Sequence, residues 1–190
     1  MSIRAFVAIP VPTDVRSHLA RLHESVPRDA GRITWVRAEA IHLTCLFLGD
    51  IEPGRVTEIG GALREAAGSF PSFETSLGEV GAFPNWRRPR VVWIGLEKGE
   101  RESREVKARI EAALVALGLP GEDKPFHPHL TLGRVRSDGR PGALERAAAR
   151  WIIPFEHWMS REAILFQSDL TPQGPIYTPL VHASLESGSG

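Results

Sequence analysis

The chain has little of what a disulfide-bonded, strongly charged or membrane-spanning protein needs. Its 190 residues include one cysteine, Cys45, so no disulfide can form within the chain, which is typical of a reducing compartment. Lys and Arg number 23, as do Asp and Glu, so the formal net charge is zero. Any attraction to a polyanion must therefore come from a local patch. No apolar run approaches the length of a membrane span.

We expect no targeting signal in the first residues of the chain and a disordered segment in its last residues. Residues 1–12 are apolar but too short for the apolar region of a signal peptide, and Pro10 and Pro12 interrupt them, so we expect a first strand there. Together with the single cysteine, this predicts a cytoplasmic protein. Residues 185–190 include a Ser/Gly run, which predicts a disordered tail after a folded domain of residues 1–184.

The hydrophobic pattern predicts short strands mixed with helices. Strands are expected near residues 3–9, 33–36, 41–48, 73–80, 91–96, 129–135, 152–156, 163–167 and 176–183. Helices are expected near residues 13–26, 53–70, 103–117 (capped by Ser103) and 141–151, and a loop is expected over 168–175. This order predicts an α+β protein with mainly antiparallel sheets.

One short pattern occurs twice, as His42-Leu43-Thr44-Cys45 and as His129-Leu130-Thr131-Leu132. Side chains alternate between the faces of a strand, so each His shares a face with the Thr two residues later. The apolar residues then face the core.

The tetrads belong to a longer repeat. His42 lies 39 residues after the strand start at Ile3, and His129 lies 38 residues after the strand start at Val91. A helix is expected between the two strands in each half. Two lobes related by a pseudo-two-fold axis would bring the tetrads together at the junction between them.

Two histidines and two threonines around one cleft suit an in-line displacement at phosphorus. One imidazole can take a proton from the attacking oxygen while the other protonates the leaving oxygen. The hydroxyls can donate to the non-bridging oxygens. A phosphodiester has one negative charge, so no metal is required, and the sequence has no cluster with familiar metal-ligand spacing.

The paired motifs and their flanks resemble the two-histidine phosphoesterase superfamily, and within it the RNA 2′,3′-cyclic phosphodiesterases, also called 2′-5′ RNA ligases. The resemblance covers nearly the whole chain. Its flanking segments are Arg4 to Ile9, Phe47-Leu48-Gly49, Phe83-Pro84, Pro89-Arg90-Val91, Phe126-His127-Pro128, Gly133-Arg134, and Gly174-Pro175 with Tyr177. Cys45 stands where an aliphatic residue is usual, and Gly133 where Ala is common.

The resemblance implies a single bilobal domain over residues 1–184, with a cleft between pseudo-symmetric lobes of antiparallel sheet and helices packed outside. It implies hydrolytic opening of an RNA or nucleoside 2′,3′-cyclic phosphate to a 2′-phosphate, with no metal and no cofactor. The expected partner is an RNA end with a cyclic phosphate, and the expected oligomeric state is a monomer. His42 would be the proton donor and His129 the proton acceptor. Thr44, Thr131 and Arg134 would bind substrate, and the reverse reaction would join RNA through a 2′-5′ bond.

Two other functions stay open from the residues alone. The first is a non-catalytic module that binds RNA ends in the same cleft. The second is a metal hydrolase that uses His42, His127 and His129, although no carboxylate completes that set.

Other residues have plainer interpretations. Strand alternation turns Arg134 away from His129 and Thr131 and predicts a surface residue, unless a bulge near Gly133 turns it back. Cys45 is expected to be a small buried residue rather than a nucleophile, and His127 a loop residue. We expect Trp35 and Phe47 in the core. The exposed cluster of Trp86, Arg87, Arg88 and Arg90 is either solvated or in contact with RNA.

Overall fold

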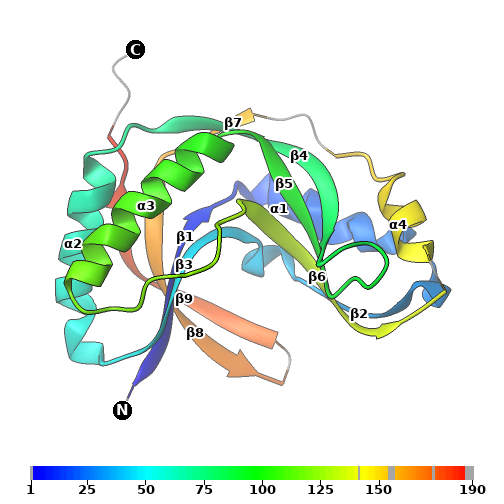
Figure 1. The fold of residues 1–190 in the computed structure, drawn as a ribbon, viewed down its shortest axis with the longest axis horizontal. Coiled ribbons are helices and arrows are strands. Elements are labelled where there is room, and N and C mark those ends of the chain that lie inside the picture. Colours follow the sequence, from blue (N-terminus) through cyan, green and yellow to red (C-terminus); the bar gives the residue numbers. More distant parts are fainter. Residues whose placement is uncertain (1, 141, 154–156, 173, 187–190) are drawn as a thin grey trace.

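The computed structural model describes residues 2–140, 142–153, 157–172 and 174–186 (Figure 1). Within these residues, nine strands form one sheet: β1 (Ile3–Pro10), β2 (Gly31–Trp35), β3 (His42–Ile51), β4 (Phe73–Phe83), β5 (Val91–Lys98), β6 (His129–Asp138), β7 (His157–Ser160), β8 (Glu162–Thr171) and β9 (Gly174–Ser184). Four α-helices accompany them in the same described ranges: α1 (Thr13–Arg21), α2 (Val56–Gly68), α3 (Glu100–Ala116) and α4 (Ala143–Ala148). The α+β class and the antiparallel pairing of the sheet are confirmed.

The strand order places the two tetrad strands side by side at the centre of the sheet. The order is β7-β4-β5-β6-β3-β1-β8-β9, and β2 also pairs with β6. On each side of the β6–β3 junction, the next strand is the one that opens the sequence repeat, β5 on one side and β1 on the other. The two halves therefore have matching strand order about the junction, as the repeat predicted.

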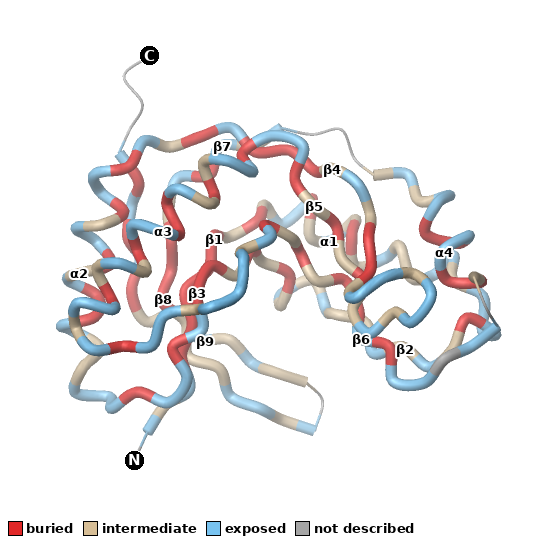
Figure 2. Tube along the Cα trace, in the orientation of Figure 1, coloured by how far each residue is buried: buried red, intermediate tan, exposed pale blue. Residues whose placement is uncertain are grey.

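The sheet curves into a half-barrel with the helices outside (Figure 1). Helices α2 and α3 pack against each other, and α2 also packs on β8 and β9. Buried residues concentrate along the central strands and on the inner sides of α2 and α3 (Figure 2). Residues 5–9 of β1 are all buried, and this strand lies between β3 and β8 in the interior of the sheet.

Two predicted boundaries near the end of the sheet are wrong. The segment 168–175 is not a loop, because β8 continues to Thr171 and β9 starts at Gly174, so the two strands form a long hairpin. Of the strand predicted at 152–156, residues 152 and 153 are described and lie outside any strand, and residues 154–156 lie outside the described residues. The strand in this region is β7, which pairs with β4.

Helix ends also differ from the pattern. Helix α3 begins at Glu100 rather than at Ser103, because Gly99 adopts a φ of +81° and starts the helix earlier, leaving Ser103 buried within it. The first and fourth helices are shorter than predicted. Leu185 is buried and Glu186 is hydrogen-bonded to Phe70 and Ser72, so these two residues belong to the folded part, while residues 187–190 lie outside the described residues. No helix in the described part is long and apolar enough to span a membrane.

Candidate active site

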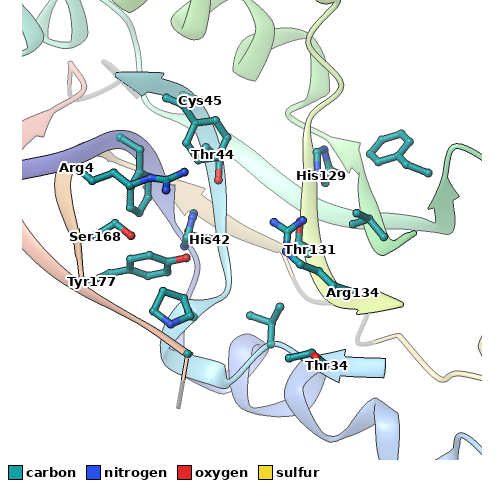
Figure 3. A pocket seen from close by; sticks show the side chains of 18 of the residues that line it. Arg4, Thr34, His42, Thr44, Cys45, His129, Thr131, Arg134, Ser168 and Tyr177 are labelled. Atoms are coloured by element: carbon teal, nitrogen blue, oxygen red, sulfur yellow. The ribbon is translucent and has the colours of Figure 1, made fainter. Parts of the chain in front are cut away.

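The two tetrads meet through a single paired position. Leu43 of β3 pairs antiparallel with Leu130 of β6, and both side chains are buried. This register places His42 of one motif across the junction from Thr131 of the other, and Thr44 across from His129. All four side chains line one cavity of about 700 Å³ (Figure 3). The predicted alternation and the meeting of the two tetrads are thus observed.

The fourth residue of each tetrad is a bulge. On β3, Leu46 and Thr44 pair with Val7 and Ala8, which leaves Cys45 without a partner across the strands. On β6, Gly133 and Thr131 pair with Val92 and Trp93, which leaves Leu132 without a partner on β5, although its carbonyl accepts a hydrogen bond from the Val36 amide. A bulge adds one residue to the strand and so reverses the alternation beyond it.

The bulges decide which residues beyond the tetrads reach the cavity. Arg134, three residues after Thr131, lines the cavity with it (Figure 3), so the prediction from regular alternation is wrong and the bulge near Gly133 is the reason. Phe47 holds the equivalent position three residues after Thr44. It lines the same cavity and is 55% exposed, so its prediction as a core residue is also wrong.

Each catalytic candidate is oriented by the backbone two residues before it. The His129 Nδ1 atom lies 2.6 Å from the His127 carbonyl oxygen, and the His42 ring is hydrogen-bonded to the backbone of Ala40. When Nδ1 of His129 donates to that carbonyl, Nε2 keeps a free lone pair. This nitrogen is then able to take a proton.

Aromatic rings surround the His42 imidazole, and burial lowers its pKa. The ring stacks on Phe6 at 4.9 Å between centroids and meets Tyr177 edge-on at 5.1 Å. Burial lowers the pKa of His42 to about 4; the hydrogen bond to Ala40 opposes this, and the charge of Arg16 adds to it.

His129 has a matching environment in the other half. Its ring meets Phe83 edge-on at 5.1 Å and lies 6.1 Å from the Trp93 ring. Burial is again the largest cause that lowers its pKa, opposed by the hydrogen bond to His127 and reinforced by the charges of His127 and Arg134. The surroundings of both imidazoles therefore favour the neutral form.

The cavity is positively charged although the chain is neutral. Its charged lining residues are Arg4, Arg37, Lys124, Arg134, Arg136 and a single acid, Glu122. This is the local patch that a chain of zero net charge requires if it binds a polyanion. The sequence motifs predicted only Arg134 of these as a binding residue, because Arg37, Glu122 and Lys124 lie outside the strands and are brought to the cavity by the tertiary fold.

Cys45 and His127 have the plainer roles, and the loop with Arg87 and Arg88 lies apart from the cavity. Cys45 is buried, and burial raises the pKa of its thiol to about 12, so it has no thiolate character. His127 lies in the loop before β6, as predicted, and holds His129 through its backbone. The Asn85 side chain accepts hydrogen bonds from the Arg87 and Arg88 backbone amides, and the three residues are not part of the cavity lining.

The described part of the chain offers no set of metal ligands. No group of three or more His, Cys, Asp or Glu side chains there is placed to hold a metal ion. The trio of His42, His127 and His129 that the sequence left open does line one cavity, but it is not placed as a ligand set.

Comparisons with known proteins agree with this architecture. The family model described as LigT like Phosphoesterase matches twice, over residues 9–93 and 94–177, one match per half of the chain. An RNA 2′,3′-cyclic phosphodiesterase of Methanothermobacter thermautotrophicus is 32% identical over 95% of this chain and 97% of its own length.

Two solved structures extend the likeness to three dimensions. The Thermus thermophilus protein TT0787 superposes with a TM-score of 0.79 at 28% identity, covering 98% of this chain and 100% of its own. Escherichia coli LigT complexed with 3′-AMP superposes with a TM-score of 0.75 at 26% identity, over 98% of this chain and 100% of its own. The double family match and these full-length likenesses show that the chain belongs to the LigT-like, two-histidine phosphoesterase family.

Proposed function

We propose that the protein hydrolyses RNA or nucleoside 2′,3′-cyclic phosphates to 2′-phosphates without a metal ion. The observation that carries this proposal is the meeting of two half-buried imidazoles and two hydroxyls in one cavity at the β3–β6 junction. A relative named RNA 2′,3′-cyclic phosphodiesterase and a LigT structure with 3′-AMP support the substrate class.

The reaction uses the two histidines in opposite roles. Nε2 of His129 takes a proton from water, and the water oxygen forms a bond to phosphorus. The bond from phosphorus to O3′ breaks in line, and protonated His42 gives its proton to O3′. The product has a free 3′-hydroxyl and a 2′-phosphate, and His129 returns its proton to solvent while His42 regains one.

The hydroxyls and Arg134 stabilise the charge on phosphorus. Thr44 and Thr131 lie beside the two imidazoles and can donate to the non-bridging oxygens, where charge increases in the transition state. Arg134 supplies a guanidinium from the same strand as His129, and a guanidinium can bind two such oxygens at once. These donors replace the charge that a metal ion would otherwise supply.

The assignment of donor and acceptor follows the family resemblance, because both imidazoles have the same kind of backbone hydrogen bond. His129 has its Nδ1 committed to the His127 carbonyl, which suits a base with Nε2 free. His42 must be protonated before it can act, and the negative charge of a bound phosphodiester raises an imidazole pKa. Substrate binding therefore supplies the charge that protonates the donor.

The same site supports the reverse reaction. If the 5′-hydroxyl of a second RNA replaces water, His129 takes its proton and a 2′-5′ bond forms. Both histidines, both threonines and Arg134 come from one chain, which supports a monomer as the active form. The single cysteine, buried and with a raised thiol pKa, supports a reducing, cytoplasmic setting.

Phosphorus NMR of a 2′,3′-cyclic nucleotide tests the proposal. The wild type should produce the 2′-phosphate, and turnover should continue in EDTA. His42→Ala and His129→Ala should each lower kcat by about 10²-fold or more while circular dichroism stays unchanged. A 3′-phosphate product would refute the order of bond breaking, and full activity in both variants would refute the mechanism. Tight binding of the cyclic phosphate without turnover would instead show that the protein is a non-catalytic module that binds RNA ends.

A further inference from the structure

The cavity continues past Arg134 along the β2–β6 pair. Thr34 of β2 pairs with Arg134 of β6, and the lining then reaches Arg136, two residues further along β6. Arg37, just after β2, also lines the cavity and donates to the Pro175 carbonyl of β9 at 3.2 Å. The catalytic proposal uses neither Thr34, Arg37 nor Arg136.

Arg136 occupies a second bulge on β6 and is held by a hydrogen bond. Arg32 and Ile33 of β2 pair with Ser137 and Val135, so Arg136 has no backbone partner across the strands. Its Nε donates to the Thr34 hydroxyl oxygen at 3.1 Å. This bond fixes the guanidinium while its two terminal nitrogens keep their N–H donors, and the Thr34 hydroxyl keeps its own proton to donate.

The positive charge at this end is not neutralised within the described part of the chain. No carboxylate there lies within ion-pairing distance of Arg37, Arg134 or Arg136. The one acidic residue of the lining, Glu122, belongs to the segment between α3 and β6 and accepts a hydrogen bond from the Phe47 amide. Guanidiniums held in place without a counter-ion are suited to a phosphate.

We propose that Arg136, Thr34 and Arg37 form a second phosphate subsite, which binds the internucleotide phosphodiester on the 5′ side of the terminal cyclic phosphate. This inference rests on the proposed function for the identity of the first phosphate. Residues two apart on a strand lie about 6.6 Å apart, which is comparable to the spacing of successive phosphates in a single strand. Arg134 therefore serves the reacting phosphate and Arg136 the next one. The subsite makes the enzyme prefer an oligonucleotide end to a mononucleotide.

The test compares two substrates that differ by one phosphate. The first is a nucleoside 2′,3′-cyclic phosphate, and the second is a dinucleotide with one internucleotide phosphodiester and the same cyclic end. Wild type should show a higher kcat/KM for the dinucleotide. Arg136→Ala should reduce that preference about tenfold, since a charge-assisted bond is lost, and change turnover of the mononucleotide less than about twofold. Arg136→Lys keeps the charge but not the fork of donors, so its preference for the dinucleotide should lie between those of wild type and Arg136→Ala.

Arg32→Ala is the matched control. Arg32 lies on the same strand pair and is exposed, and it does not line the cavity, so its removal changes the net charge equally without touching the subsite. An equal loss in both variants would mean a general field effect and would overturn the proposal. A selective loss in Arg4→Ala instead would place the second phosphate at the opposite end of the cavity and would also overturn it.

Binding separates this proposal from the catalytic one. If wild type turns over neither substrate, the proposed function fails, and the affinities of wild type and Arg136→Ala for the intact dinucleotide and mononucleotide still decide the subsite. A dinucleotide preference that disappears in Arg136→Ala supports it. Equal affinity for both ligands in wild type overturns it.

Discussion

Binding of an oxyanion should return His42 to the protonated form, and sulfate is a suitable probe because it does not titrate near neutral pH. Burial lowers the pKa of His42 to about 4 in the free protein. At pH 7, a group with this pKa is protonated in roughly one molecule in a thousand. His42 can therefore act as a proton donor only if the bound substrate raises its pKa.

The size of this rise in pKa follows from Coulomb's law. The sulfate oxygens that face the imidazolium, taken as one of the dianion's two negative charges about 4 Å away at an effective dielectric constant of about 20, contribute about 4 kcal/mol, or about 3 pKa units. The pKa of His42 should therefore rise from about 4 to about 7 when the anion binds. Because the protonated form binds the anion more tightly, affinity should fall up to about tenfold per pH unit between these two values.

Proton NMR of the imidazole Cε1–H resonances measures this directly, with His42→Asn to assign the His42 signal. pH titrations of this signal should give a midpoint of about 7 with saturating sulfate and about 4 without it. Sulfate affinity followed across the same pH interval should show the predicted decline. A midpoint near the ordinary histidine value without sulfate, or a midpoint that sulfate does not move, would refute the reasoning.

Three further substitutions have expected outcomes. Gly133→Ala should cost about 1–3 kcal/mol in chemical unfolding and disturb the cavity wall, because the new Cβ would lie 2.7 Å from a ring carbon of Trp35. Lys107→Met should cost about 2 kcal/mol in the same assay, because the buried ammonium, 2.6 Å from the Glu111 carboxylate, would be lost and its partly exposed partner left behind. Thr131→Val should lower kcat about 10- to 100-fold with little change in stability, measured by steady-state kinetics, if its hydroxyl donates to the transition state.

Each of these variants has a control in the same chain. Gly61→Ala, where no atom lies within 4 Å of the added Cβ, should not destabilise the protein. Lys98→Met removes a cation from an ion pair whose members are about half exposed and should cost less than about 1 kcal/mol. Thr131→Ser should retain most activity. Equal losses in test and control would mean that the contact named is not the cause.

The sequence alone determined the elements that depend on local pattern. Alternation and apolar content located β1, β3, β5 and β6, and the duplicated His-x-Thr spacing identified the four central side chains, because a strand fixes which residues share a face. Helix starts and strand ends were predicted less well. Gly99 supplies the start of α3 where the pattern indicated Ser103, and β9 includes Gly174 and Pro175, which had indicated a loop.

Only the tertiary structure decided which residues beyond the two tetrads line the cavity. A bulge depends on the partner strand as well as on its own residues. No spacing in the sequence therefore showed that Cys45 is unpaired toward β1 and Leu132 toward β5, or that Phe47 and Arg134 turn toward the cavity. The same is true of the pKa of His42, which is set by burial among rings such as Phe6 and Tyr177 from distant segments. The sequence thus determined which groups could do the chemistry, and the packing of the two halves decided their charge state and their neighbours.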